Sequence, residues 1–530
     1  MSTRLSTGGR LIDRSRKIEF RFNGKRLQGH PGDTLASALM ASGQKIVGRS
    51  FKYHRPRGVV ASGSEEPNAL VNLGHGRTHE PNQRATTTEL FDGLTATSQN
   101  HWPSLEWDIG ELNALVPRFL PAGFYYKTFI HPRAFWKHVF EPFIRQSAGL
   151  GRAPDPKQTD ADRYEHFYAH CDVVIAGGGI AGLQAALEAG RAGAKVILCE
   201  ETAHWGGRAP VDGVEIDGQP AETWINATVQ ALDEMENVDL RPRTAVAGVY
   251  DHGYVLAYER VSDHAPGPDA PRHRLWRIRA GQVIAATGAL ERPLSFPGND
   301  KPGVMLASAM RDYLVNWGVS PGDRTVVVTN NDDAYRTALA IKDAGLDVPC
   351  IVDAREAADG PLVQAARACG IPVKTGMGIA GVKGLRGVVA VQLCRQAGEG
   401  TVVEDVVCDA VAMSGGWSPV VHLWSHCGGK LNWDADRALF RPDHARPPTN
   451  QSGDGFVVCA GAADGALGAA ETLENASAMA RKALETYGKP LPEASVPRAA
   501  AADEAPLAPI WVMPQGAGAR KRSKMWLDFQ

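Results

Sequence analysis

The chain has 530 residues, of which 43% are hydrophobic and 22% are charged, and its formal net charge at pH 7 is −2. This composition allows a large buried core and excludes a wholly disordered chain, and a nearly neutral protein has no global electrostatic attraction to nucleic acid or an anionic membrane. Because the sequence also lacks a run of about 18 apolar residues and an apolar secretory signal, we expect a soluble, multidomain, cytoplasmic protein with no nucleic-acid or membrane partner.

Residues 16–95 are predicted to form a small unit that is rich in β-structure. Lys17–Phe22 alternates in the pattern of a strand, Asn23-Gly24 marks a turn, and Lys25–Gln28 can return as the second strand of a hairpin. A short helix is expected over Leu35–Ser42, because a glycine directly after it can close the last turn.

A basic and aromatic loop, Ser50–Gly58, follows this helix. We interpret its cations Lys52, Arg55 and Arg57 as a contact for a flavin phosphate or for a partner subunit. The alternative is a solvated or internally paired loop. One basic loop in a nearly neutral chain argues against an RNA-binding patch.

Residues 96–170 hold many Trp, Phe and Pro residues without a clean period, and we interpret them as an ordered connecting segment. Within this segment, residues 152–165 are polar. They are predicted to be the linker into the next domain.

From Cys171 onward, strands alternate with helices, which indicates a parallel α/β sheet. The strongest chemical signal is VVIAGGGIAG at Val173–Gly182, which follows a buried strand and opens a helix. In this context Gly177 is expected to make a tight turn, Gly179 to let the backbone approach a pyrophosphate, and Gly182 to allow close packing of helix and strand. The free N–H groups at the start of the helix would then face the phosphates.

Three further motifs make this signal more specific. Glu200 ends the next strand, 18 residues after Gly182, and a carboxylate there can accept from a ribose 2′-OH while repelling a 2′-phosphate, which argues against NADP. Gly206-Gly207-Arg208 follows it at the spacing of two-dinucleotide flavoproteins. Ile284–Gly288 (IAATG) is their strand-to-loop element, and Phe456–Gly465 is their returning strand and small-residue turn.

These motifs predict a discontinuous nucleotide-binding domain over residues 171–290 and 410–485, in which Thr244–Val246 lies where this fold usually contacts the adenine. The insert between them, 291–409, is expected to hold a second nucleotide-type fold. Its turn, Asn330–Ala334, has no glycine and carries two carboxylates that oppose a pyrophosphate. We interpret it as a degenerate relic rather than an unusual NAD(P)H site, which argues against a free-standing NAD(P)H:flavin reductase. The absence of a cysteine pair argues against a disulfide reductase.

The bound nucleotide is expected to be NAD, with FAD as the alternative. In flavoproteins of this kind, an Asp directly after the Gly of the last motif usually binds the ribityl chain. Here Gly461 is followed by Ala462-Ala463, and Asp464 is displaced by two residues. A smaller and less polar turn favours NAD.

Several segments together resemble a known family, the α subunit of heterotetrameric sarcosine oxidase. The match covers residues 15–490. It is carried by SFKYHRPRG at Ser50–Gly58, GSEEPN at Gly63–Asn68, the GGGIAG fingerprint, the ATG element followed by Glu291-Arg-Pro293, and GGWSP at Gly415–Pro419.

The resemblance implies a two-dinucleotide-binding (FAD/NAD(P)-binding, Rossmann-like) α/β domain preceded by a small ferredoxin-like α+β domain. Because no cysteine precedes Cys171, the small domain cannot hold a cysteine-ligated [2Fe–2S] cluster, and no metal ligands are expected. The resemblance further implies a non-catalytic NAD on this chain, FAD and a covalent FMN on a β subunit, and a complex with β, γ and δ subunits.

By matching of motifs, the NAD-contacting positions would be Ala181, Glu200, Glu201, Thr202, Arg208, Val246, Ala462 and Leu467. The fingerprint and loop motifs add Gly177, Gly179, Gly182, Gly207, Thr287 and Gly288. Family α subunits continue into an aminomethyltransferase-like domain that binds tetrahydrofolate, whereas this sequence stops near that boundary after a tail, 486–530. Without that domain, the oxidation is expected to release formaldehyde.

The leading hypothesis is therefore an NAD-binding α subunit of a sarcosine oxidase-like oxidoreductase, whose partner oxidatively demethylates sarcosine to glycine with formation of hydrogen peroxide. The alternative is an FAD-dependent dehydrogenase subunit for an opine, proline or another secondary amine. Those subunits usually carry a C-terminal cysteine cluster, which the region after Cys459 lacks. A third possibility is a scaffold without nucleotide. No catalytic residue is assigned on this chain, and the candidates by type are interpreted as structural: His54, His204, His422 and His426.

Overall fold

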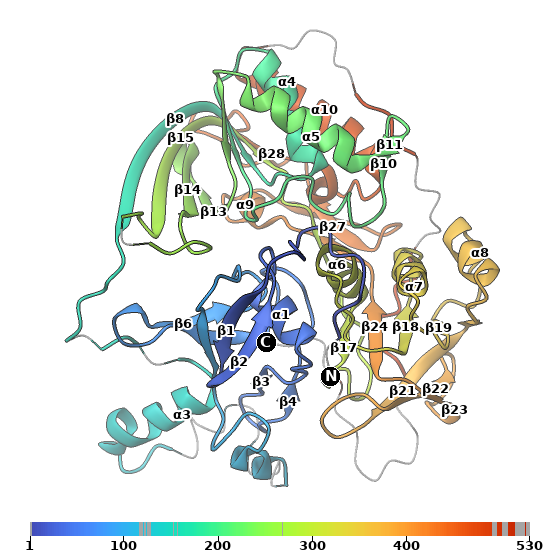
Figure 1. Ribbon diagram of the computed structural model, residues 1–530. Helices are drawn as coiled ribbons and strands as arrows, with labels where there is room; N and C mark the ends of the chain where they lie inside the picture. Colours follow the sequence, from blue (N-terminus) through green and yellow to red (C-terminus); the bar gives the residue numbers. More distant parts are fainter. Residues whose placement is uncertain are drawn as a thin grey trace. The chain divides into compact units, whose positions relative to one another are not determined.

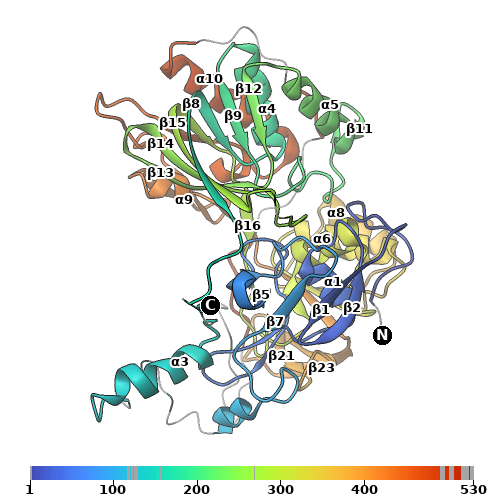
Figure 2. The ribbon, with the colours of Figure 1, turned by 60° about the vertical axis from the view of Figure 1, so that its left-hand side comes forward.

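The computed structural model describes residues 3–115, 120, 123, 129–151, 153–155, 157–267, 269–489, 496–500, 507–514 and 525. The chain divides into two compact units, whose secondary structure is drawn in Figures 1 and 2. Unit 1 consists of Met1–Ala161, Pro293–Gly416 and Ala508–Gln530, and unit 2 of Asp162–Arg292 and Trp417–Leu507. In the part of the chain that is described, no helix is both long and apolar enough to cross a membrane.

The N-terminal part of unit 1 is a five-stranded sheet of order β2-β1-β7-β5-β6. Alternate residues of β1 are buried, and Asn23, with a φ of 48°, turns the chain into β2. The hydroxyl of Thr34 accepts the backbone N–H of Ser37 at 3.1 Å and thereby caps α1. The elements are β1 (Ile18–Phe22), β2 (Lys25–Gly29), α1 (Leu35–Ala41), β3 (Gly48–Arg49), β4 (Pro56–Arg57), β5 (Leu70–Leu73), η1 (Gly76–Thr78), β6 (Glu80–Arg84) and β7 (Thr95–Ser98).

The next residues of unit 1 form short helices. These are η2 (Ile109–Leu115), η4 (Trp136–Phe140) and α3 (Glu141–Ser147). The predicted connecting segment therefore contains helical turns, and part of it lies outside the described residues.

A parallel sheet of order β17-β24-β18-β19-β20 forms the second part of unit 1. Its strand β18 reads TVVVT and is buried throughout, as expected for a β-branched strand inside a parallel sheet. Helices α6, α7 and α8 pack side by side along the sheet (Figure 1). The elements are β17 (Val304–Leu306), α6 (Ala307–Trp317), β18 (Thr325–Thr329), α7 (Asp333–Asp343), β19 (Ile351–Asp353), α8 (Pro361–Ala368), β20 (Val373–Thr375), β24 (Ala410–Ser414) and an antiparallel sheet of β21 (Met377–Lys383), β22 (Ala390–Arg395) and β23 (Val402–Val407).

The two sheets of unit 1 share one hydrophobic core. A single cluster of buried side chains runs from Phe20 and Leu39 in the N-terminal part to Met305 and Val327 in the insert. Backbone contacts follow the same path, since the N–H of Leu306 donates to the carbonyl of residue 60 at 2.9 Å. The N-terminal part and the insert of unit 1 therefore share one core, and Met513 of its third segment belongs to the same cluster.

Unit 2 is built on the parallel strands β12-β9-β8-β15, with β28 paired to the second half of β15. Helices α4, α5 and α10 cover one face of this sheet and enclose a core of small and branched residues (Figures 1 and 2). The elements are β8 (Tyr164–Ala176), α4 (Ile180–Arg191), β9 (Val196–Cys199), β10 (Glu215–Ile216), β11 (Gln219–Pro220), α5 (Ala221–Asp233), β12 (Val238–Arg241), β15 (His273–Ala285), β28 (Val457–Cys459) and α10 (Ala469–Thr486).

The first half of β15 pairs with an antiparallel hairpin of β14 (Tyr254–Arg260) and β13 (Thr244–Tyr250). Strands β8 and β15 bend strongly, as Figure 1 shows. A second core cluster lies between this hairpin and the parallel sheet, and it includes Trp424, which is 1% exposed. The remaining elements are η5 (Asp251–Gly253), β16 (Ala289–Glu291), β25 (Trp417–Pro419), α9 (His422–Ser425), β26 (Leu431–Asp434), β27 (Leu439–Pro442) and η6 (Gly461–Asp464).

These units differ from the expected boundaries at two places. Strand β8 begins at Tyr164 rather than after residue 170, because its first half pairs with β15 along the whole register. The expected small domain, 16–95, and the expected insert, 291–409, lie together in unit 1, because they share a core. The start of the tail, 486–489, continues from α10, and residues 508–514 pack in unit 1.

Candidate nucleotide-binding site

The fingerprint glycines join the end of β8 to the start of α4. Gly177 has a φ of 108°, and a Cβ built on it would lie 2.2 Å from the carbonyl oxygen of Ala286. A Cβ built on Gly182 would lie 1.8 Å from the carbonyl oxygen of Gly177. Neither position accepts a side chain without displacing backbone, so these glycines allow α4 to pack closely on the strand.

Gly179 is the N-cap of α4, and the space beside it is open. The nearest atom to a Cβ built there is the Cα of Gly207, 3.9 Å away. Among the described residues, no side chain caps the helix. An open helix N-terminus of this kind, next to a glycine, can receive a pyrophosphate.

The second glycine loop lies directly against the first. The N–H of Gly206 donates to the carbonyl of Gly178 at 2.8 Å. A Cβ built on Gly207, whose φ is 56°, would lie 3.1 Å from the Cα of Gly179. The two motifs, far apart in sequence, therefore line one crevice.

Glu200 follows β9 and turns its carboxylate onto the fingerprint loop. Oε2 accepts the N–H of Gly178 at 2.7 Å, and Oε1 accepts both the N–H and the hydroxyl of Thr202 at 2.8 Å. Burial raises the pKa of this carboxyl above its ordinary value, although these donors oppose the shift. Oε2 retains a lone pair, so Glu200 can still accept from a sugar hydroxyl.

Trp205 belongs to the site but was not singled out by the sequence analysis. A Cβ built on Gly178 would lie 2.4 Å from the Trp205 ring and 3.0 Å from the Cβ of Glu200. The ring and Glu200 therefore both pack against the fingerprint loop. The ring packs against the core of unit 2 and gives the crevice an apolar wall. The available signal was an aromatic residue directly before the Gly206-Gly207 pair.

Arg208 ends the second glycine loop and is held from two sides. Its Nη2 lies 3.0 Å from Asp212 Oδ1, and its guanidinium carbon lies 5.2 Å from the centre of the Trp417 ring. An arginine over an aromatic face is stabilised by the ring electrons. Arg208 is therefore a fixed positive charge next to Gly207. Trp417 is a second residue that the sequence analysis quoted only as a mark of resemblance.

The strand-to-loop element Thr287-Gly288 follows β15. The N–H of Ala286 donates to the carbonyl of Ala176 at 2.8 Å, which places the element beside the end of β8. The hydroxyl of Thr287 donates to the carbonyl of Val420 at 2.6 Å. Gly288 has a φ of 75° and no atom within 4 Å of a built Cβ. The hydroxyl is thus used within the protein, while the glycine backbone has open space beside it.

The last motif is tied to two helices. A Cβ built on Gly461 would lie 2.6 Å from the Cβ of Ala181 in α4. The N–H of Gly461 donates to the Asn475 Oδ1 in α10 at 2.8 Å. The small residues Gly461 and Ala181 therefore allow the closing turn to reach the fingerprint helix. Asn475 was missed by the sequence analysis because nothing distinguishes it within a helical period.

Asp464, the displaced acid of this motif, is only 1% exposed. Asn475 Nδ2 donates to its Oδ2 at 2.7 Å, and His444 Nε2 lies 2.9 Å from its Oδ1. Oδ2 is therefore hydrogen-bonded within the protein, whereas the buried Oδ1 lies beside His444 and forms no hydrogen bond with the described residues. The turn offers a ligand the backbone around Ala462 instead of an acid.

The other expected positions surround this crevice. Glu201 and Thr202 are exposed, and Thr202 holds the carboxylate of Glu200. Val246 is partly buried on β13, whose first residue donates its N–H to the carbonyl of Glu200 at 2.7 Å. Leu467 is 42% exposed between η6 and α10. The fingerprint glycines, Glu200, Ala181 and Gly461 contact one another directly. For Val246 and Leu467, the contacts described here are made by neighbouring residues of the chain.

These residues fit an adenine dinucleotide. The open N-terminus of α4 matches a diphosphate, and the Glu200 carboxylate matches sugar hydroxyls. When bound, NAD supplies a nicotinamide and FAD a flavin as the redox group.

The turn between β18 and α7 is filled by charges of its own chain. Arg355 Nη2 lies 2.6 Å from Asp332 Oδ1 and 2.7 Å from Asp353 Oδ2, and all three side chains are buried. Burial alone would lower the pKa of Arg355, but the two carboxylates raise it above the ordinary value. The hydroxyl of Tyr335 also donates to Asp353 at 2.8 Å. The two carboxylates share this one arginine. A diphosphate at this turn would therefore meet acids and no unpaired cation of this cluster.

Residues 508–514, which we call the strap, lie across the same turn. Asn330 Nδ2 donates to the carbonyls of Ala508 and Ile510 at 2.9 and 3.0 Å. Trp511 Nε1 donates to the carbonyl of Gly415 at 2.8 Å. The chain therefore covers the end of β18 with its own backbone, at the place where a second dinucleotide would bind.

Two cations of the basic loop are paired within the protein. Arg55 contacts Asp300 through Nε and Nη2 at 2.8 and 2.6 Å, and Arg57 Nη1 lies 2.7 Å from the same carboxylate. Lys52 lies 5.1 Å over the Tyr53 ring. These contacts support the internally paired alternative for Arg55 and Arg57 rather than a phosphate contact.

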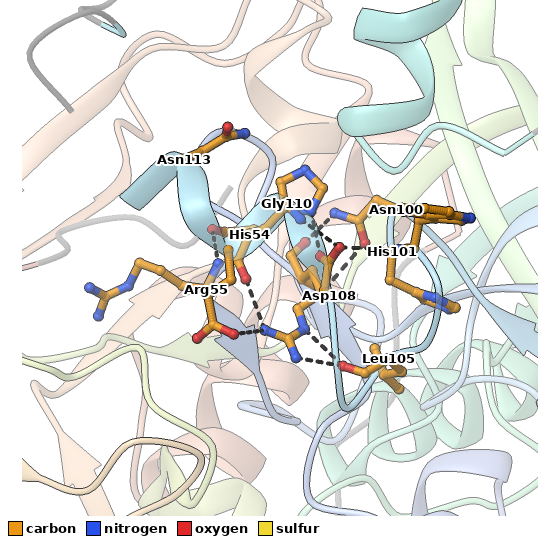
Figure 3. Close-up of polar contacts among 12 residues, drawn as sticks. His54, Arg55, Asn100, His101, Leu105, Asp108, Gly110 and Asn113 are labelled. Carbon is orange, nitrogen blue, oxygen red and sulfur yellow. Dashed lines mark hydrogen bonds and ion pairs between the residues drawn. The ribbon is translucent and has the colours of Figure 1, made fainter. Parts of the chain in front are cut away.

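His54 contacts a buried carboxylate, and His426 contacts backbone. His54 is buried, and its Nδ1 lies 2.5 Å from Asp108 Oδ2 (Figure 3). His426 Nε2 contacts the backbone N–H of Val249 at 2.9 Å. Of the other two candidates, His422 begins α9, and the N–H of His204 donates to a threonine hydroxyl at 3.2 Å. The contacts of His54 and His426 agree with a structural role.

Comparisons with known proteins identify two families along the chain. A model described as "2Fe-2S iron-sulfur cluster binding domain" matches residues 15–101, and one described as "Pyridine nucleotide-disulphide oxidoreductase" matches residues 171–438. The chain is 44% identical over 524 residues to the sarcosine oxidase subunit alpha of Rhizobium meliloti, covering 98% of this chain and 51% of the relative. It is 35% identical to the corresponding subunit of Corynebacterium sp. strain P-1, covering 98% and 49%. The chain thus spans about half the length of these curated relatives.

A solved structure, L-proline dehydrogenase from P. horikoshii, shares the fold at a TM-score of 0.59. The sequences are 21% identical, and the match covers 93% of this chain and 77% of that one. With the two family matches, this confirms the expected fold class, an α/β Rossmann-like nucleotide-binding part preceded by a ferredoxin-like part.

The cysteines of this chain fit neither the 2Fe–2S cluster named in the first family description nor the disulfide chemistry named in the second. The first cysteine of the chain is Cys171, outside the 2Fe–2S match, so no cysteine is available to ligate a cluster there. All eight cysteines are free thiols. Burial raises the pKa of Cys199 to about 12 and that of Cys427 to about 11, so these thiols are poor nucleophiles for disulfide chemistry.

Proposed function

We propose a function for a chain that belongs to the pyridine nucleotide-disulphide oxidoreductase family and is a homologue of sarcosine oxidase α subunits. In this proposal it is the NAD-binding subunit of a sarcosine oxidase-like complex. In this proposal the complex demethylates sarcosine to glycine in the cytoplasm, with formation of hydrogen peroxide. FAD and FMN are carried by a β subunit, and γ and δ subunits complete the complex.

The observation that carries the choice of NAD is the state of Asp464. Asp464 is only 1% exposed, its Oδ2 is hydrogen-bonded to Asn475, and its Oδ1 lies 2.9 Å from His444 Nε2. This acid therefore lies inside the protein rather than at the surface of the turn after Gly461, which supports a ligand without a ribityl chain. Glu200, in contrast, keeps a lone pair beside the open end of α4. These features support a ligand with two ribose rings and no ribityl chain. The carboxylate of Glu200 also disfavours the 2′-phosphate of NADP.

The chemistry of the substrate is assigned to the partner because we assign no catalytic residue to this site among the described residues. The imidazole of His444 is paired with Asp464, and the hydroxyl of Thr287 donates to a backbone carbonyl. The residues of this site bind and orient the nucleotide. In this proposal the nucleotide is a resident group rather than a substrate that is exchanged at each turnover.

The test is to release the nucleotide from the purified, undenatured chain and to identify it by absorbance and mass spectrometry. We expect close to one NAD for each chain, with no reduction of the bound nucleotide by sarcosine in the isolated subunit. Release of FAD, with a yellow chromophore that sarcosine or proline reduces, would overturn the proposal in favour of a catalytic dehydrogenase subunit. Absence of any nucleotide would overturn it in favour of a scaffold.

A further inference from the structure

The outer face of the curved sheet in unit 2 is a regular array of tyrosine, arginine and histidine side chains. It is formed by the first halves of β8 and β15 together with β14, whose bend is visible in Figure 1. We call this surface the Tyr/Arg face. The strand register places its residues in four rows across the sheet: Tyr164–His273–Arg260, His166–Leu275–Tyr258, Tyr168–Arg277–Leu256 and His170–Arg279–Tyr254.

The alternation of the strands separates this face from the core. The intervening residues Val255, Ala257 and Ile278 are fully buried. On the outer side, Tyr168 is 72% exposed and Tyr258 is 40% exposed. Two-residue periodicity therefore divides the side chains of these strands between two faces. The second face is buried at Val255, Ala257 and Ile278, whereas Phe167 on the same face is 39% exposed.

The acids of these strands lie on the inner side. Glu165, Arg274 and Glu259 form one row of the register, and Arg274 Nε lies 2.9 Å from Glu165 Oε2. Within the strand segments that form it, the Tyr/Arg face therefore carries three arginines and the histidines His166 and His170 but no carboxylate, while its third histidine, His273, is buried. The nearest acids in the connecting loops, Asp251 and Asp263, belong to turns, and Asp263 is paired with His273 and an arginine.

The two central arginines are held in fixed orientations. Arg277 Nη1 donates to the Tyr168 hydroxyl at 2.8 Å, and its guanidinium carbon lies 5.2 Å from the centre of that ring. Arg279 lies 5.0 Å over the ring of Tyr254. A guanidinium has five N–H groups, so each retains donors beyond these contacts. Their orientation is set before any partner arrives, which reduces the entropy lost on binding.

We propose that the Tyr/Arg face is a docking surface for an acidic surface of a partner protein. Tyrosine and arginine are the residues most enriched in the energetic centres of protein interfaces. A face with cations and no carboxylate attracts acidic groups and repels basic ones. The exposed tyrosines add apolar area and hydroxyl donors at their edges, and bidentate contacts from Arg277 and Arg279 to carboxylates supply specificity.

A protein partner fits this face better than single-stranded nucleic acid. Bases stack on free aromatic faces, whereas guanidinium groups already cover one face of Tyr168 and of Tyr254. A subunit of an oxidase complex needs a docking surface, but this inference does not depend on the nucleotide. Its failure would leave nucleotide retention unchanged.

The experiment measures binding of the full chain to two labelled probes by fluorescence anisotropy. One probe is a random copolymer of glutamate and tyrosine, and the other is polyuridylate. We expect the copolymer to bind more tightly than polyuridylate, and the double variant R277Q/R279Q to bind the copolymer about tenfold more weakly than the wild type. The control R274Q, on the inner face of the same strand, should bind as the wild type does.

The variant R277K/R279K keeps both charges and should bind the copolymer more tightly than R277Q/R279Q. Raising the salt from about 50 mM to about 300 mM should weaken binding by the wild type more than by R277Q/R279Q, because the arginine contacts are screened. Equal binding of the copolymer by the wild type and R277Q/R279Q, at equal nucleotide content, would overturn the proposal. Tighter binding of polyuridylate than of the copolymer would overturn it in favour of a nucleic-acid partner.

Discussion

Gly179 determines how closely a diphosphate can approach the start of α4. A valine there would place methyl groups in the open space between α4 and Gly207, at a φ of −67° that valine adopts without strain. We expect Gly179→Val to retain the fold and to reduce the nucleotide released per purified chain by more than about tenfold. The control is Gly267→Val, where a built Cβ meets no atom within 4 Å. Retention at the wild-type level would show that the ligand lies elsewhere.

Glu200 makes nucleotide binding depend on pH. Burial raises the pKa of its carboxyl in the free chain, and sugar hydroxyls donate to the ionised form. Affinity should therefore be full above the raised pKa and should fall as the pH drops through it. After the resident nucleotide has been removed, titrations of NAD into the nucleotide-free chain by calorimetry between about pH 8 and about pH 5 should show weakening toward acid.

The variant Glu200→Gln should bind NAD about tenfold more weakly at neutral pH and lose most of this pH dependence. Glu215→Gln, an exposed acid on β10, is the control and should keep the wild-type profile. A wild-type profile that does not change with pH would contradict the assignment of Glu200 to the sugar.

At the scale of elements, the turn between β18 and α7 is stabilised by one buried arginine. Replacing Arg355 by Met would leave Asp332 and Asp353 buried without their cation, so we expect the free energy of unfolding to fall by about 3–5 kcal/mol. The matched control is Arg324→Met, because the pair of Arg324 with Asp347 is half-exposed on both sides and should contribute less than about 1 kcal/mol. Denaturant unfolding measures both values. Similar effects for the two variants would contradict the buried-cluster interpretation.

The strap shows which elements sequence reasoning finds and which it misses. The β18 turn was identified as degenerate because missing glycines and added carboxylates are visible in a short motif. The strap has no hydrophobic period, and its contacts come from Trp511 and from backbone groups that meet Asn330 about 180 residues away. Such pairing depends on tertiary structure and leaves no local signal.

At the scale of the whole molecule, each unit has its own core, and two unfolding transitions are expected. The proposed NAD site lies in unit 2, so adding NAD to the nucleotide-free chain should raise the transition temperature of that unit and leave the other nearly unchanged. Arg355→Met should lower only the transition of unit 1. Differential scanning calorimetry with and without NAD tests both statements. A single transition that NAD and the substitution shift together would show that the units unfold cooperatively.

The sequence predicted the nucleotide crevice better than it predicted the division of the chain. Gly177, Gly182 and Glu200 are parts of a motif with fixed spacing, so their roles could be inferred without a structure. Trp205 was missed because an aromatic residue in a loop has no spacing rule. The union of the small N-terminal part with the insert was also missed. It rests on side chains such as Phe20 and Val327, whose contact network spans some 300 residues.

The shared core of unit 1 explains why a ferredoxin-like sheet persists where the first 170 residues hold no cysteine to ligate iron and sulfur. Its apolar side belongs to the same cluster as the insert, so losing the sheet would expose that surface to water. A gene truncated after residue 161 should accordingly yield an insoluble fragment. Natural selection could remove the cluster ligands from this sheet without removing the sheet itself.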